Sequence, residues 1–175
     1  MVKYNGSTSK RMSKLISVAL IGMGLSAAFC SSALAADELY HGNFCTPNRD
    51  HVNKIDFGQY GVLNISSSNT AFVQCPFKLP FSANLKVTNL TVTVYDRHPS
   101  ADVSCKLTSV GMEGHTIWSI TRSTSGAQAG HKYLTFQPPN TNVLGTLNMI
   151  CSLPPLTNFD KGTSHITTYR IITTP

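Results

Sequence analysis

The sequence has few of the residues that build helices. Glutamate occurs only twice in 175 residues, at Glu38 and Glu113, whereas serine, threonine, valine and asparagine are abundant. After residue 36 the apolar positions show no helical period, and the frequent β-branched residues favour strands. The composition therefore excludes a helical bundle and indicates an all-β fold.

Catalytic and cofactor motifs are also missing. The chain has no Gly-x-Ser-x-Gly elbow, no His-Glu-x-x-His, no phosphate-binding glycine loop and no pair of carboxylates on one predicted strand. None of its histidines stands at ligand spacing from another, and most adjoin Gly, Pro or Asp, so we expect them in loops. The histidines are His41, His51, His98, His115, His131 and His165. We predict no catalytic residue, no cofactor and no metal site.

Charge of one sign is not concentrated after residue 36. The chain carries 14 Lys and Arg against eight Asp and Glu, but four of the basic residues precede residue 15 while every acid follows residue 36. The ten basic residues beyond that point exceed the acids by only two, and they are scattered singly. The isoelectric point near 9.2 is therefore no argument for a nucleic-acid partner, and we expect none.

The N-terminal segment has the pattern of an export signal. A basic start precedes an apolar run from Leu15 to Phe29 and a tail of small residues. Ala33 and Ala35 supply the Ala-x-Ala pattern of signal peptidase, so we expect cleavage after Ala35, with cleavage after Ala36 as the near alternative. The apolar run is shorter than the roughly 20 residues that a membrane-spanning helix needs, which disfavours an uncleaved anchor.

We accordingly expect residues 1–35 to be a signal peptide and residues 36–175 to form one domain. The mature chain would be secreted or periplasmic, without stable insertion in a membrane.

Four cysteines remain after the leader, Cys45, Cys75, Cys105 and Cys151. An even number in an exported chain predicts two disulfides, and spacings of at least 30 residues disfavour a metal site. Alternation places Cys105 and Cys151 on the apolar faces of their strands. Two core-facing cysteines on neighbouring strands or on opposed sheets can come close enough for a disulfide. We therefore favour Cys105 with Cys151, which leaves Cys45 with Cys75. The other two pairings stay open.

Period-two alternation recurs along the domain. In the segment 90–95, Leu90, Val92 and Val94 share one face and polar residues take the other. Turn signals rich in Gly, Pro, Ser and Asn separate such segments. The predicted strands cover residues 61–65, 71–77, 90–95, 103–110, 116–122, 132–136, 144–153 and 166–172. We predict a single antiparallel β-sandwich or jelly-roll-like domain of about eight strands.

Two local features could bear on function. Asp96-Arg97-His98 is the densest polar cluster, and a strand-ending turn with an Asp–Arg pair accounts for it. Trp118 shares a strand face with Ile120 and could line a sugar-binding platform if that face were exposed. Packing in the core is the more economical interpretation of a lone tryptophan.

Seven segments form a pattern around the cysteines and strands: Phe44-Cys-Thr, Tyr60-Gly-Val-Leu-Asn64, Val73-Gln-Cys-Pro76, Val92-Thr-Val-Tyr-Asp96, Val103-Ser-Cys105, Ile150-Cys-Ser-Leu-Pro154 and Ser164-His-Ile-Thr-Thr-Tyr-Arg170. Together they resemble an uncharacterised group of small secreted proteins of Gram-negative bacteria. The resemblance spans nearly all of the mature chain and implies a secreted, β-rich domain with no activity to carry over.

A second similarity covers only about Cys45 to Cys75 and includes Phe57-Gly-Gln-Tyr60. There the chain is similar to spore-coat-U and fimbrial subunits, which implies a subunit that assembles with copies of itself. The latter half of the chain lacks the rest of that family's pattern.

The leading hypothesis is a secreted or surface-associated, non-enzymatic domain that binds a protein or glycan ligand or has a structural role. The alternatives are a self-assembling pilin-like or coat-like subunit, and a carbohydrate-binding or hydrolytic domain with an unrecognised site. The sequence leaves the ligand, the oligomeric state and the choice between periplasm and exterior open.

Overall fold

Alternating apolar residues form antiparallel strands through the part of the chain that the structure describes. The structure is a computed structural model, and it describes residues 35–79, 86–126, 130–139, 145–157 and 162–174. The predicted signal peptide lies outside these residues apart from Ala35. Its cleavage after Ala35 or Ala36 stays a prediction.

Eleven described strands form two sheets. Sheet A contains β1 (Ala36–His41), β3 (Ile55–Gly58), β4 (Gly61–Asn64), β6 (Lys86–Tyr95), β9 (His131–Phe136) and β11 (His165–Thr174). Sheet B contains β2 (Thr46–Pro47), β5 (Ala71–Cys75), β7 (Ser104–Gly111), β8 (Thr116–Ser123) and β10 (Gly145–Leu153). The strand order is β3-β4-β11-β6-β9 in sheet A, with β1 also on β11, and β2-β5-β10-β7-β8 in sheet B.

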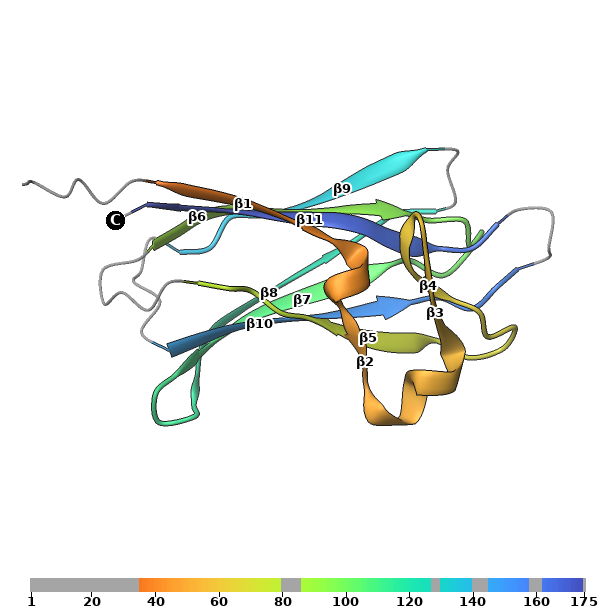
Figure 1. Ribbon diagram of the computed structural model, residues 1–175, viewed down its shortest axis with the longest axis horizontal. Coiled ribbons are helices and arrows are strands. Elements are labelled where there is room, and N and C mark those ends of the chain that lie inside the picture. Colours follow the sequence, from red (N-terminus) through yellow and green to blue (C-terminus); the bar gives the residue numbers. More distant parts are fainter. Residues whose placement is uncertain (1–34, 80–85, 127–129, 140–144, 158–161, 175) are drawn as a thin grey trace, which may run out of the picture. The chain divides into compact units, whose positions relative to one another are not determined.

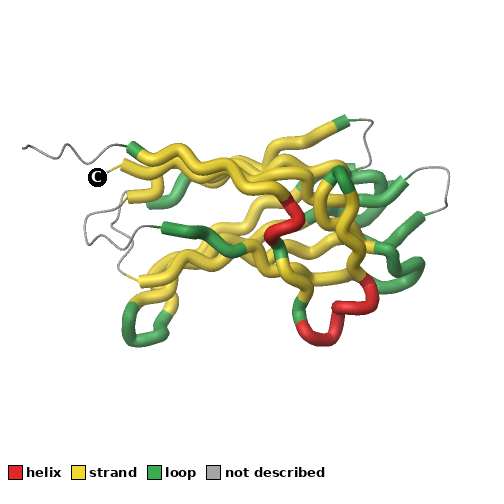
Figure 2. The backbone as a smooth tube through the Cα atoms, in the orientation of Figure 1, coloured by secondary structure: helices red, strands yellow, loops and turns green. Residues whose placement is uncertain are grey.

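The two sheets form the two layers of a sandwich, with sheet A above sheet B in Figure 1. Two short 3-10 helices, η1 (Gly42–Phe44) and η2 (Arg49–Lys54), lie in the segment that connects β1 to β3 (Figure 2). Among the described residues, no helix has the length and apolar character to cross a membrane.

The hydrophobic core lies between the inward faces of the two sheets. In β6, Leu90, Val92 and Val94 are fully buried, as the alternation predicts. The largest side chains of the core include Tyr169 of β11 and Phe136 of β9, which are also fully buried. Burying an aliphatic or aromatic side chain of this kind contributes about 1.5–3 kcal/mol, so the alternating positions hold the layers together.

Both disulfides lie within sheet B. Cys105 of β7 faces Cys151 of β10 directly, and Cys45, just before β2, is bonded to Cys75 of β5. The Cα atoms of each pair are 4.0 Å apart, close to the roughly 4.5 Å of facing residues that share no backbone hydrogen bonds. These are the two pairings that the sequence favours, and they join neighbouring strands of one sheet rather than opposed sheets.

The predicted fold class is confirmed as an all-β, antiparallel two-sheet sandwich with two disulfides. Each of the eight predicted segments corresponds to a strand, from β4 to β11. The structure adds three strands before them, β1, β2 and β3. Of these, β1 pairs with β11 over six residues, so the first and last described strands are neighbours in sheet A.

A bulge in β11 positions the β3–β4 hairpin. The register of β11 on β6 shifts between Ile166 and Thr168, which leaves one extra residue in β11. The backbone of Gly61 approaches this bulge so closely that an added Cβ would lie 1.9 Å from the Ile166 carbonyl oxygen. Gly61 also has φ +118°, which favours glycine. The hairpin turn, with Tyr60 next to Gly61, is thereby held against the start of β11.

Candidate functional site

Three aromatic and imidazole rings form a row across the outer face of sheet A. Tyr95 is the last residue of β6, and it faces His165 of β11 on one side and His131 of β9 on the other. Alternation places all three outward, because their neighbours Val94 and Ile166 point into the core. Rings from three strands therefore meet at one end of the sheet.

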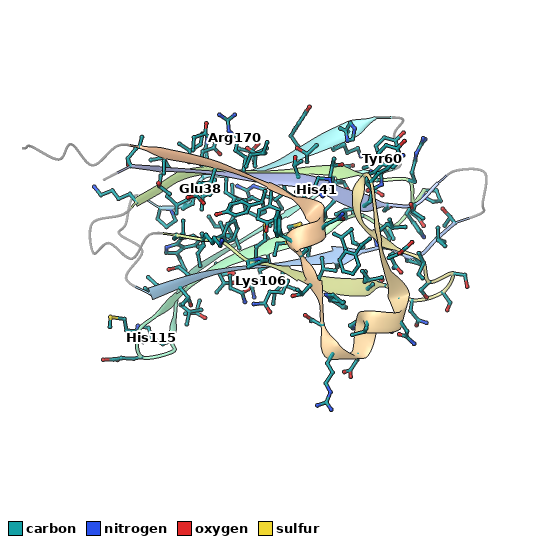
Figure 3. The ribbon with its side chains drawn as sticks, viewed as in Figure 1. Glu38, His41, Tyr60, Lys106, His115 and Arg170 are labelled. Carbon is teal, nitrogen blue, oxygen red and sulfur yellow. A yellow bond between two sulfur atoms is a disulfide. The ribbon has the colours of Figure 1, made fainter. Side chains whose placement is uncertain are left out.

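The rings are close enough to make contact. The centroids of Tyr95 and His165 are 5.1 Å apart with nearly parallel planes, and those of Tyr95 and His131 are 5.3 Å apart with one ring edge toward the other. Tyr60, at the turn of the β3–β4 hairpin, lies 6.3 Å from His165. Figure 3 shows Tyr60 at this end of the upper layer and His115 at the opposite end of the lower one.

Together the four rings of Tyr60, Tyr95, His131 and His165 line an open pocket of about 300 Å³. We call it the ring pocket. Tyr60 is 63% exposed, so the outer wall of the pocket is accessible to solvent. Its size is at the lower end of the range of small-molecule sites, which suits a ligand with a single ring.

His165 is held as a neutral acceptor. Its Nδ1 lies 3.0 Å from the carbonyl oxygen of Thr163 and must carry the proton, because a carbonyl oxygen only accepts. Burial lowers the pKa of His165 below 6.5; the hydrogen bond to Thr163 opposes this, and the charges of His131 and Arg97 reinforce it. Near neutral pH its Nε2 therefore offers a lone pair to a ligand.

Arg97 lies against the wall of the ring pocket. Its guanidinium carbon is 4.4 Å from the centroid of Tyr95, a cation–π contact. Its Nε is buried and has no hydrogen-bond partner among the described residues. The ion pairs of the described residues are His115–Glu113 and Arg170–Asp37, so Arg97 has no carboxylate partner there.

The predicted Asp96–Arg97 pair is therefore wrong. The Asp96 carboxylate is fully buried and makes no ion pair with Arg97. It accepts hydrogen bonds from the hydroxyls of Thr124 and Ser164 and from the backbone N–H of His98 and Val103. These bonds fix the turn after β6, and a buried carboxylate needs such donors. Asp96 is thus a structural residue, as the turn hypothesis implies, and Arg97 is free to contact Tyr95.

The predicted loop positions of the histidines are only partly confirmed. His98 and His115 lie in turns, whereas His131 and His165 begin strands; His41 ends β1 and His51 lies in η2. Within the described ranges no group of three or more His, Cys, Asp or Glu could hold a metal ion.

A second pocket, of about 200 Å³, lies beside the core and is lined by Tyr40, Phe44, Pro76, Lys78 and Tyr169. Here Tyr40 stacks on Tyr169 at 4.9 Å, the Tyr169 hydroxyl donates to the Pro76 carbonyl at 2.8 Å, and the Lys78 N–H donates to the Tyr40 hydroxyl at 2.9 Å. Burial raises the pKa of Tyr40 to about 12. Since these rings contact each other and the backbone, they connect the layers and leave the ring pocket as the better site.

Trp118 is partly buried and packs against the core together with Ile120. Its indole Nε1 is buried and has no partner among the described residues. This placement favours the core interpretation over an exposed sugar platform on β8.

The comparisons with known proteins give no family. No family model matches the chain, and no curated protein matches it. Among solved structures, the coat protein of Tobacco streak virus is 8% identical with a TM-score of 0.39, over 81% of this chain and 85% of that chain. A chain of infectious bursal disease virus, Gx strain, is 6% identical with a TM-score of 0.40, over 81% of this chain and 32% of that chain.

The enzymatically active domain of tailspike protein 4 of bacteriophage CBA120 is 7% identical with a TM-score of 0.37, over 80% of this chain and 19% of that chain. This chain therefore spans a third or less of the second and third of these structures. At such scores the likeness carries no information about function.

Proposed function

We propose that this protein is an exported, non-enzymatic binding domain whose binding site is the ring pocket. The observation that carries the proposal is the convergence of Tyr60, Tyr95, His131 and His165, from four strands or turns, around one solvent-accessible pocket on an otherwise threonine-rich sheet face. Aromatic rings that are not needed in the core are typical of binding surfaces.

Binding is favoured over catalysis by the chemistry of the pocket. The described lining has two imidazoles and two phenols, and no carboxylate, thiol or aliphatic hydroxyl that could act as a nucleophile beside a histidine. Both imidazoles contact the Tyr95 ring. An arrangement of this kind orients a ligand and provides polar contacts around it.

Export is supported by two features that act together. The leader has the three zones of a signal peptide. The two buried disulfides of sheet B are of the kind that form and persist outside the reducing cytoplasm. Sheet A, which carries the ring pocket, packs against this disulfide-bonded sheet, and a rigid scaffold is a suitable support for an exposed binding pocket.

The test is a ligand screen with matched variants. The purified mature domain would be screened by ligand-observed NMR against glycans and small metabolites, alongside Tyr95→Ala and Tyr133→Ala. Tyr133 lies on β9, on the same outer face, is 68% exposed and lies outside the pocket. We expect ligands of the unmodified domain to lose at least about fivefold in affinity in Tyr95→Ala, because a stacked ring contributes about 1 kcal/mol or more.

Tyr133→Ala should bind like the unmodified domain. A ligand that binds equally well to both variants would place the binding site elsewhere and contradict the proposal. The proposal would also be contradicted if the screen found no ligand for the unmodified domain. Amide spectra show that both variants are folded.

A further inference from the structure

From the charge around the ring pocket we infer that its ligand is a sugar acid, a pyranose ring that bears a carboxylate, with Arg97 as the residue that receives the carboxylate. This inference rests on the proposed function and adds the ligand class to it. It is carried by the guanidinium of Arg97 beside the Tyr95 ring: among the described residues its buried Nε has no hydrogen-bond partner and no carboxylate pairs with it.

Among the described residues, no carboxylate lines the ring pocket, and the guanidinium of Arg97 contacts its wall. The lining comes from Tyr95 of β6, His131 of β9, His165 of β11 and Tyr60 of the β3–β4 turn. Arg97, in the turn after β6, lies outside this lining and contacts the Tyr95 ring. The nearest acid in sequence, Asp96, directs its carboxylate into its own hydrogen-bond network. Among the described residues no carboxylate competes for Arg97, so the pocket is electrostatically complementary to an anion.

Arg97 is suited to a carboxylate in particular. A guanidinium presents parallel N–H donors that match the two oxygens of a carboxylate. Within the described part of the chain the buried Nε of Arg97 has no partner, and a buried donor without a partner is unfavourable. A bound carboxylate would supply the missing acceptor, while the contact with Tyr95 holds the guanidinium plane in place.

The rest of the pocket favours a hydroxylated ring over an aromatic acid. The C–H faces of a pyranose can pack against the rings of Tyr60 and Tyr95, and the pocket of about 300 Å³ suits one such ring. The Nε2 of neutral His165 can accept a hydrogen bond, which a sugar hydroxyl can donate and a benzoate cannot. Ring, hydroxyls and carboxylate are combined in a uronic or sialic acid.

The experiment compares acids with their neutral counterparts. The methyl glycosides of glucuronate, galacturonate and mannuronate, each beside the corresponding neutral hexoside, and N-acetylneuraminate would be titrated into the mature domain and followed by the shifts of its amides and imidazoles. We expect at least one acid to bind about tenfold or more tightly than its neutral counterpart, the ratio typical of one charge-assisted hydrogen-bond pair.

Variants of two arginines test the assignment. Arg97→Gln should remove the preference for the acid, and Arg97→Lys, which keeps the charge but not the planar fork, should retain only part of it. Arg49→Gln changes an exposed arginine of η2 and should leave the preference unchanged. Amide spectra test whether each variant is folded. If Arg97→Gln does not fold, the ratio of acid to neutral affinity in Arg97→Lys tests the role of Arg97 instead.

The outcomes separate this inference from the proposed function. Neutral hexosides that bind as tightly as the acids, with loss in Tyr95→Ala, would overturn the sugar-acid inference and leave the ring pocket as a binding site. An acid preference that survives in Arg97→Gln would overturn the role of Arg97. Tighter binding of glucose 6-phosphate or of benzoate than of every sugar acid would also contradict the inference, since the pocket would then select a phosphate or an aromatic ring.

Discussion

At the scale of single residues, the rings of the pocket have a consequence for stability as well as for binding. His165 is held neutral by burial and by its neighbours His131 and Arg97, which lower its pKa below 6.5. An unfolded histidine takes up a proton as the pH falls through 6.5, whereas the folded one resists it. The stability contributed by neutral His165 is therefore fully present above pH 6.5 and is lost as the pH falls toward its pKa in the folded state.

We predict that the unmodified domain loses more stability than His165→Gln when the pH is lowered from about 7.5 to about 5, because only the former must keep an imidazole uncharged. Urea unfolding at both pH values measures the difference. His115→Gln, at an exposed histidine of the β7–β8 turn, serves as the control and should behave like the unmodified domain. An identical pH response in the domain and in His165→Gln would contradict this account of His165.

At the scale of the elements, the β3–β4 hairpin depends on one glycine. Gly61 combines a positive φ with a backbone approach to Ile166 that leaves no room for a Cβ. We predict that Gly61→Ala lowers the free energy of unfolding by about 2 kcal/mol or more, through backbone strain and displacement of the hairpin. Because Tyr60 moves with the hairpin, ligand binding at the ring pocket should weaken too.

Gly114→Ala is the matched control for Gly61→Ala. Gly114 also has a positive φ, +83°, but an added Cβ would meet nothing within 4 Å. Its substitution should cost about 1 kcal/mol from strain alone and leave binding intact. Chemical denaturation of both variants gives the comparison, and equal losses would mean that the approach to β11 has no energetic importance.

The sequence predicts a strand where apolar and polar residues alternate regularly, and it gives no such prediction where they do not. Segment 90–95 alternates between apolar and polar residues, and it is a strand. β1 has apolar Leu39 68% exposed and polar Glu38 on the more buried face, so its pattern does not distinguish the faces. β2 has two residues, one of them Pro47, and gives no periodic signal at all.

The ring pocket could not be predicted, because it depends on the order of strands rather than on any one strand. Tyr95 and His131 are 36 positions apart in the sequence, and His131 and His165 are 34 positions apart. Only the order β11-β6-β9, with its register, makes them neighbours. Alternation alone does indicate that Tyr95 points outward, and an outward aromatic residue at a strand end is the signal that could have suggested a site.

At the scale of the whole molecule, both disulfides stabilise sheet B. A disulfide restricts the unfolded chain and so raises the free energy of unfolding. The Cys105–Cys151 bond, with a sequence separation of 46 residues, contributes about 4 kcal/mol, and the Cys45–Cys75 bond, with a separation of 30, contributes slightly less. We predict losses of this size for the paired variants Cys105→Ala/Cys151→Ala and Cys45→Ala/Cys75→Ala in urea unfolding. A pair whose removal leaves stability unchanged would show that its bond is not formed in the native protein.

The pairing of β1 with β11 bears on self-assembly. Because β1 fills the edge of β11 within the chain, that edge is not available to a strand from another copy. On the other side of the sandwich, Arg122 of β8 donates to the Thr135 carbonyl of β9 at 3.2 Å and covers part of that edge. We predict a monomer in light scattering, and association once residues 36–41 are deleted. Filaments or rings of the intact mature domain would favour a self-assembling subunit instead.

The measurement that tests the ring pocket most directly is the NMR titration of the mature domain, labelled in its histidine and tyrosine rings, with the acidic and neutral glycosides. We predict that a bound glycoside shifts the ring signals of Tyr60, Tyr95, His131 and His165 while those of His115 and Tyr133 stay in place. Shifts confined to other rings, or no shift at the four pocket rings with any probe, would contradict the assignment of this pocket as the binding site.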